Sequence, residues 1–140
     1  MNLYAESSAV LSWLLGEEAG REVAGVLAVA DEIIASDLTL VECDRVLVRG
    51  VAAGVLTEAA AAERRHTLSR AAAHWHVLHL VEDAVERARR PFPIEPIRTL
   101  DALHLSLALT ARAVLPDLEV LSLDRCVREN ALALGLRVAP

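Results

Sequence analysis

Residues 99–110 read Thr-Leu-Asp-Ala-Leu-His-Leu-Ser-Leu-Ala-Leu-Thr, and this stretch decides the fold. Its apolar residues follow helical spacing and cover nearly the whole circumference, which is typical of a buried helix. Asp101 nevertheless lies in the first turn, with His104 one turn later on the same side. A carboxylate removed from water needs a hydrogen bond, an ion pair or a metal. The segment alone leaves three interpretations open: a helix cap, an ion pair with Arg98, or a functional acid.

Length and composition indicate one globular domain. The chain has 140 residues, of which 54% are hydrophobic, enough for one core and too many for a disordered protein. We therefore expect a single domain over residues 1–140. No uncharged stretch is long enough to span a bilayer, and the N-terminus does not resemble a signal peptide, so we expect a cytoplasmic location. The isolated Cys43 and Cys126 fit reduced, partly buried thiols there.

The charged residues limit the classes of partner. The net charge of −6 argues against a protein that coats nucleic acid without selectivity. All 14 basic residues are arginines, whose planar guanidinium groups can bind phosphates through two hydrogen bonds.

Short apolar runs alternate with helical patterns along the chain. We expect strands at Leu3–Ala5, Glu32–Ser36, His76–Val81, Glu119–Leu123 and Leu136–Val138. We expect helices at Ala9–Gly16, Glu18–Ala30, Asp37 to Gly50 or Gly54, Thr57–Ala73, Glu82–Arg90, Thr99 to the residue before Pro116, and after Asp124 as far as Gly135. This alternation is typical of an α/β domain with a mostly parallel sheet.

Four acidic residues differ from the others in their position. Glu6 and Asp124 directly follow apolar strands. Asp101 begins the buried helix, and Glu42 lies on the helix after the second strand. In a parallel sheet these helix starts share one rim, where α/β proteins build their sites. Converging carboxylates repel one another, and a divalent cation relieves the repulsion; oxygen ligands favour Mg²⁺ or Mn²⁺ over Zn²⁺.

The segments around these acids follow one another in a fixed order: Tyr4–Ala9 (Tyr-Ala-Glu-Ser-Ser-Ala), Thr39–Glu42 (Thr-Leu-Val-Glu), Ile97–His104 (Ile-Arg-Thr-Leu-Asp-Ala-Leu-His), Leu121–Arg125 (Leu-Ser-Leu-Asp-Arg) and Ala131–Leu136 (Ala-Leu-Ala-Leu-Gly-Leu). Together they resemble PIN-domain proteins, and most closely the VapC-type toxins of bacterial and archaeal toxin–antitoxin pairs. The resemblance implies a three-layer α/β/α fold with a short, mostly parallel five-stranded sheet in the strand order 3-2-1-4-5. In that order the strands ending at Glu6 and Asp124 are neighbours.

The same resemblance implies an endoribonuclease that cleaves RNA phosphodiesters with a metal-activated water, using Mg²⁺ or Mn²⁺. The metal-binding, catalytic acids of the family correspond to Glu6, Glu42, Asp101 and Asp124. Ser8 and Ser122 match the small hydroxyl residues that accompany the first and last acids. Arg98 and Arg125 are candidate contacts for RNA phosphates.

Protein partners are implied as well. The resemblance suggests a homodimer and a cognate VapB-type antitoxin, whose tail would cover the acidic groove and place a basic side chain where the metal binds. The amphipathic helices around Trp13–Leu15 are the candidate contact surface. No membrane partner is expected.

The chain departs from the family at Glu6, where the usual residue is Asp. One extra methylene moves the carboxylate, and Mg²⁺ demands near-ideal octahedral geometry. The alternative hypothesis is therefore a PIN-like binding or regulatory module whose catalysis is weakened or lost.

Other interpretations have less support. His74, His76 and His79 have no Cys or carboxylate at ligand spacing, so a zinc site is not favoured. His104 fits a packed, hydrogen-bonded histidine better than a catalytic base. A phosphotransfer domain would gather acids at the same rim, but the chain has no Lys to engage a phosphoryl group.

Overall fold

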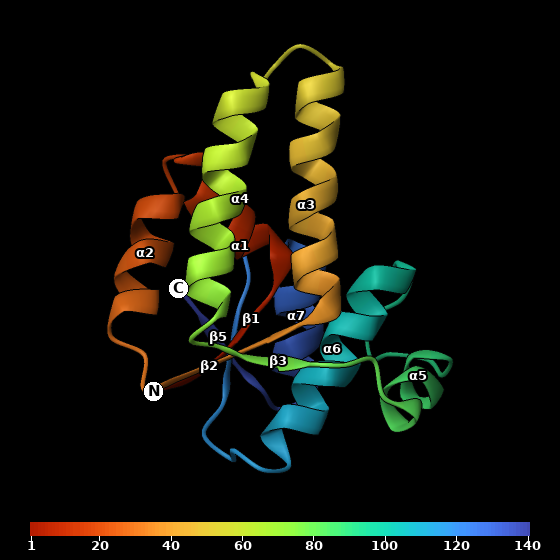
Figure 1. Cartoon of the computed structure of the whole chain (residues 1–140). Coiled ribbons are helices and arrows are strands. Elements are labelled where there is room, and N and C mark those ends of the chain that lie inside the picture. The colour runs from red at the N-terminus through yellow and green to blue at the C-terminus, as the bar shows by residue number, and fades with distance from the viewer.

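A parallel sheet of short strands forms the centre of the fold (Figure 1). The computed structural model, which describes residues 1–140, orders the strands as β3-β2-β1-β4-β5. Their bounds are β1 (Asn2–Ala5), β2 (Glu32–Ser36), β3 (His76–Leu78), β4 (Glu119–Leu121) and β5 (Arg137–Ala139). Every pair of neighbours is parallel. The expected strand order is confirmed, and the sheet is wholly rather than mostly parallel.

Helices cover both faces of this sheet (Figure 1). They are α1 (Ser7–Leu15), α2 (Gly20–Ala28), α3 (Asp37–Ala52), α4 (Glu58–Ala72), α5 (Glu82–Ala88), α6 (Thr99–Arg112) and α7 (Arg125–Ala133). The apolar core groups α1–α4 on one face and α5–α7 on the other. This is the expected three-layer arrangement. None of the helices is both long and apolar enough to cross a lipid bilayer.

The alternation of side chains along the strands assigns each residue to a layer. Tyr4 and Val120 pack with α6 and α7, whereas Leu3, Ala5 and Leu121 pack with the helices of the opposite face. Helix α6 is buried over most of its circumference, as its sequence predicts. Among its apolar residues Leu100 is the exposed one, at 43% near the start of the helix.

The strand predicted at Glu119–Leu123 is too long, because the structure ends β4 at Leu121. The amide of Ser122 still donates to Ala139 O of β5, but the next two amides, those of Leu123 and Asp124, both donate to Ser8 Oγ in α1, at 2.9 and 3.1 Å. The predicted strand His76–Val81 is likewise too long, since β3 ends at Leu78 and Val81 becomes the N-cap of α5. The last strand lies one residue later than predicted.

Candidate functional site

The carboxyl ends of β1 and β4 lie side by side at the centre of the sheet. Tyr4 is paired with Val120 and Ala5 with Leu121, and the next amide, that of Glu6, donates to Leu121 O at 3.0 Å. The chain order reverses between these two strands, which is where open α/β sheets form their crevice. Helix α1 begins just after Glu6, and α7 begins after the short segment Ser122–Asp124, so the acids that follow both strands are brought to one rim.

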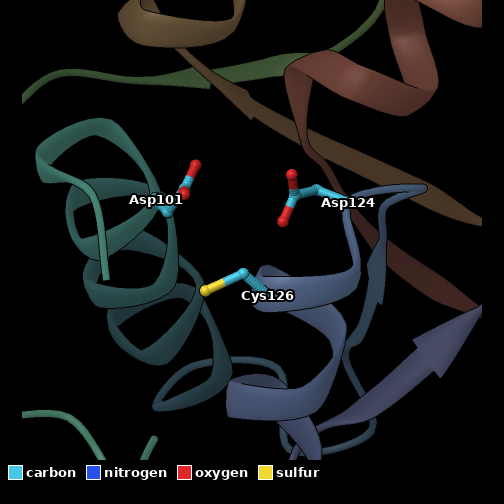
Figure 2. Close-up of side chains that lie close together, drawn as sticks. All are labelled: Asp101, Asp124 and Cys126. Atoms are coloured by element: carbon cyan, nitrogen blue, oxygen red, sulfur yellow. The ribbon is translucent and has the colours of Figure 1, made fainter. Parts of the chain in front are cut away.

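Asp101 and Asp124 face each other across this rim (Figure 2). Asp101 comes from the first turn of α6, and Asp124 is the residue before α7. Cys126, in the first turn of α7, completes the group: one ligand atom from each of the three residues lies within 4.8 Å of the others. Two hard oxygen donors at the starts of separate helices can hold a divalent cation, and the sulfur adds a softer donor.

Arg98 supplies the positive charge next to these two carboxylates. Its Nε lies 3.3 Å from Asp101 Oδ2, and its Nη2 lies 3.6 Å from Asp124 Oδ2. Its side chain is 80% exposed, so solvent screens both pairs. Of the three interpretations of Asp101, the ion pair is therefore present, whereas the cap is wrong: α6 has no side-chain cap. Asp124 does cap its helix, accepting from the amide of Val127 at 3.0 Å.

Burial makes the charged form of Asp101 unfavourable. The removal of its carboxyl from water raises the pKa of Asp101 above its ordinary value, and the charges of Asp124 and Glu6 raise it further. The hydrogen bond from Arg98 offsets only part of this effect. A carboxylate in this position is stabilised by any additional cation, so the group fits a divalent ion by both its donors and its charge.

The carboxylate of Glu6 is buried and fully occupied by hydrogen bonds. Oε1 accepts from Ser7 Oγ at 2.8 Å and from the amide of Ser8 at 3.1 Å, which caps α1. Oε2 accepts from Ser122 Oγ at 2.7 Å and from the hydroxyl of Ser8. The longer side chain thus folds back over its own helix, and both of its oxygens are used by the protein. Ser8 and Ser122 both bond the first acid, whereas the family pattern implies Ser8 beside the first acid and Ser122 beside the last.

Glu42 lies beside Glu6, and Ser7 connects the two. Ser7 Oγ is 3.1 Å from Glu42 Oε1. This Glu42 oxygen also accepts from His104 Nε2 at 2.5 Å. Burial by itself raises the pKa of Glu42, but the hydrogen bond from His104 lowers it, and the pKa is lowered overall. Glu42 is therefore an ionised carboxylate at the same rim.

The chain shows a match to a known family. The model of the PIN domain matches residues 3–125. The chain belongs to the PIN domain family. No protein of curated function matches its sequence significantly.

Solved structures share the fold of this PIN domain over nearly its whole length. VapC20 of Mycobacterium tuberculosis, described as a Sarcin-Ricin loop cleaving toxin, has a TM-score of 0.68 and 15% identity, covering 96% of this chain and 95% of its own. A toxin–antitoxin complex from Klebsiella pneumoniae has a TM-score of 0.65 and 17% identity, and the match covers 100% of this chain and 97% of the other. VapBC2 of Rickettsia felis, bound to promoter DNA, has a TM-score of 0.64 and 9% identity, and the match covers 99% of this chain and 98% of the other. At these identities the likeness establishes a common fold.

The acids of this PIN domain form two pairs rather than one tight cluster. Asp101 and Asp124 share the group with Cys126, while Glu6 and Glu42 are joined through Ser7 and lie outside that group. The sequence predicts one group of four acids at the rim, whereas the structure arranges them as two pairs. That all four acids bind metal stays a prediction.

Two neighbours of the site were not predicted from the sequence. Ser7 is not among the predicted site residues, although it lies directly after Glu6 and within hydrogen-bond distance of two acids. Cys126 was interpreted as an isolated thiol, but its position two residues after Asp124 places it on the first turn of the same helix. Burial raises the pKa of the Cys126 thiol, and the charges of Asp101 and Asp124 raise it further.

The remaining residues that the sequence analysis considered have partners of their own. Arg125 is 90% exposed and pairs with Glu129 along its own helix at 3.5 Å, so its role as a phosphate contact stays a prediction. His76 and His79 each bond a carboxylate, that of Glu32 at 2.9 Å and that of Asp37 at 2.8 Å. Trp13 packs against Trp75, with ring centroids 6.4 Å apart.

Proposed function

We propose that this PIN domain is a VapC-like endoribonuclease that depends on Mg²⁺ or Mn²⁺. The observation that carries the proposal is the pair of carboxylates, Asp101 and Asp124, facing each other at the crevice of the parallel sheet. Burial and the neighbouring charge of Asp124 disfavour the charged form of Asp101, and a divalent ion would relieve both effects. The family and the toxin structures that share the fold point to the same chemistry.

Asp101 and Asp124 are the residues that would hold the ion, and we propose that Glu42, from the second pair of acids, contributes as well. When bound, the ion would activate water towards the scissile phosphate and neutralise charge at the leaving oxygen. Glu6 acts on the site through Ser8 and Ser122, because its hydrogen bonds tie the start of α1 to the end of β4. The exposed guanidinium of Arg98 is free to exchange its aspartate partners for a phosphate of the RNA.

Protein partners follow from the same comparison. Solved structures with this fold include toxin–antitoxin complexes, so we propose a VapB-type antitoxin and a homodimer as partners. A groove that includes Glu42 combines apolar side chains with two arginines; it is lined by Leu11, Leu38, Val41, Glu42, Arg45, Val46, Arg49 and Leu100. Its mixed character suits an amphipathic partner segment. An RNA substrate would place the protein in the cytoplasm.

The direct test is cleavage of total cellular RNA by the purified chain with Mg²⁺, with Mn²⁺ or with a chelator. We expect discrete fragments with either ion and none with the chelator. Cleavage that survives the chelator would contradict a metal-dependent nuclease.

Replacing Arg98 by Gln should strengthen Mn²⁺ binding roughly two- to fivefold, because an exposed cation that competes for Asp101 and Asp124 is removed. Titration calorimetry measures the change. Arg125→Gln is the matched control, since Arg125 pairs only with Glu129 and should leave Mn²⁺ affinity unchanged. Weaker Mn²⁺ binding by Arg98→Gln would mean that Arg98 assists the ion instead of competing with it.

One observation favours the second candidate, a PIN domain whose catalysis is weakened. Both oxygens of Glu6 are occupied by serine hydroxyls and an amide, so this acid has no free oxygen for a metal. Such a protein would keep the fold and the partner surface but cleave RNA slowly.

Glu6→Asp separates the two candidates. If the chain is an active nuclease that uses Glu6 to tie Ser122 to α1, the shorter side chain loses that bond and cleavage falls about tenfold or more, since small displacements at a site are costly. A rise in the cleavage rate of Glu6→Asp would instead support the weakened module. Rates are compared at saturating Mn²⁺, with the melting temperature of each variant as the control for folding.

A further inference from the structure

A series of buried, hydrogen-bonded side chains extends from the centre of the sheet to Glu42. His104, on the second turn of α6, is 1% exposed. Its Nδ1 lies 2.9 Å from the hydroxyl oxygen of Tyr4, and its Nε2 lies 2.5 Å from Glu42 Oε1. The rings of Tyr4 and His104 pack edge to face, with centroids 6.0 Å apart and planes at 69°. The imidazole therefore has a partner at each nitrogen and little freedom to turn.

At the end opposite Glu42, this series of side chains is held by the sheet and by the start of α3. Tyr4 is fully buried in β1, and its hydroxyl oxygen also lies 3.2 Å from Ser36 Oγ. Ser36 is the N-cap of α3, accepting from the amide of Thr39 at 3.3 Å. Because Glu42 lies on that same helix, this series of hydrogen-bonded side chains connects β1, α3 and α6 through the imidazole of His104.

The direction of the hydrogen bond to Glu42 follows from its charge. An ionised carboxylate can only accept, so His104 Nε2 carries the hydrogen whether the ring is neutral or protonated. Nδ1 faces the Tyr4 hydroxyl, which can donate to a neutral ring or accept from a protonated one. In both states the bond to Glu42 is the same.

The oxygens of Glu42 are used unequally. His104 and Ser7 both contact Oε1, and no protein group bonds Oε2. Glu6 differs, because both of its oxygens are occupied. Glu42 is thus held by one oxygen while the other is available to a ligand, which is the arrangement expected of a metal-binding carboxylate that is oriented by a neighbouring histidine.

We propose that His104 is a positioning residue: oriented by Tyr4, it fixes Glu42 Oε1 so that Oε2 is presented to a divalent cation at the acidic rim. The proposal rests on the proposed function, because it takes Glu42 as a member of the metal site. His104 itself touches neither metal nor substrate. The alternative is a histidine that only fills the core, in which case its two nitrogens would matter for stability alone.

Two substitutions separate positioning from packing. His104→Gln keeps an amide donor near the place of Nε2, whereas His104→Asn keeps a polar group near Nδ1 but is too short to reach Glu42. We expect His104→Asn to weaken Mn²⁺ binding about tenfold and His104→Gln to stay within about threefold of the unsubstituted protein. Titration calorimetry gives the affinities, and thermal melts of the metal-free proteins give their stability.

The outcomes are distinct. Equal Mn²⁺ affinities for His104→Asn and the unsubstituted protein would overturn the positioning role, and so would equal losses in both variants that follow their melting temperatures. If the unsubstituted protein itself binds no Mn²⁺, the proposed function fails and the metal-directed role of His104 fails with it. Binding that Asp101→Asn abolishes but His104→Asn leaves intact would remove the inference and keep the proposed function.

A spectroscopic measurement avoids any dependence on how the variants fold. Long-range ¹H–¹⁵N spectra of the metal-free, unsubstituted chain assign the hydrogen of the His104 ring. We expect a protonated Nε2. An Nε2 without hydrogen would contradict the proposed bond to Glu42.

Discussion

Asp101→Asn should abolish metal-dependent RNA cleavage, lowering the rate by at least about 10³-fold. The amide keeps the shape of the side chain but removes one of the two charges that face each other at the rim. Charge stabilisation by a bound ion contributes several kcal/mol to such a reaction, and about 1.4 kcal/mol corresponds to a factor of ten in rate. Cleavage rates at matched Mn²⁺ concentration provide the measurement.

The same substitution should leave the metal-free fold as stable as before, or more stable. Because burial raises the pKa of Asp101, the folded protein binds a proton at this carboxyl more tightly than the unfolded chain does. The stability that this proton contributes is present below the unfolded pKa and is lost as the pH rises through the folded pKa. At pH 7 the ionised carboxyl therefore opposes folding, and Asn removes that cost. Thermal melts at pH 7 and at acidic pH check the sign.

Asp117→Asn is the matched control for this experiment. Asp117 lies at the opposite, amino end of β4, where it accepts from Asn2 Nδ2 at 2.8 Å. The hydrogen bond from Asn2 lowers the pKa of Asp117. We expect full cleavage activity from Asp117→Asn. Equal activity of Asp101→Asn and the unsubstituted chain would reject the assignment of the site.

Gly20→Ala should destabilise the fold by about 3 kcal/mol, the second large effect that the structure predicts. Gly20 begins α2 where this helix crosses the end of α1. A methyl group there would lie 2.2 Å from the carbonyl oxygen of Ser12 and 2.9 Å from the Cα of Trp13. Both atoms belong to the backbone, so no side chain can turn aside, and the two helices must separate. The gain in helix propensity, about 1 kcal/mol, does not compensate.

Gly25→Ala is the control on the same helix. A methyl group at Gly25 has no neighbour within 4 Å, so the substitution should be neutral or stabilise the fold by up to about 1 kcal/mol. Urea titrations of both variants measure the two free energies of unfolding. Equal stabilities would show that α1 and α2 do not pack as closely as described.

The elements of the fold follow from local patterns that the sequence displays. β2 has the predicted bounds, Glu32–Ser36, because a β-branched run lies between polar residues and Ser36 is a good N-cap. The buried helix α6 is evident from apolar residues on almost every side. The rim position of the four acids follows from strand ends and helix starts in a parallel sheet.

The details that the sequence does not predict depend on contacts between distant segments. Ser8 ends β4 early by accepting from two amides more than a hundred residues away in the chain. Gly20 carries no local signal of its close approach to Ser12. The hydrogen bonds that occupy Glu6 come from Ser122 as well as from its own helix, so its side-chain direction depends on tertiary structure. The pairing of the acids into two groups has the same origin.

The central claim is that Asp101 and Asp124 hold a divalent cation, and a crystal structure after soaking in Mn²⁺ tests it most directly. The anomalous signal of manganese locates the ion independently of any assay. We expect a peak between the carboxylates of Asp101 and Asp124, with Arg98 moved away from them. Soaked crystals that show no peak at this rim, and Arg98 still paired with both aspartates, would contradict the claim.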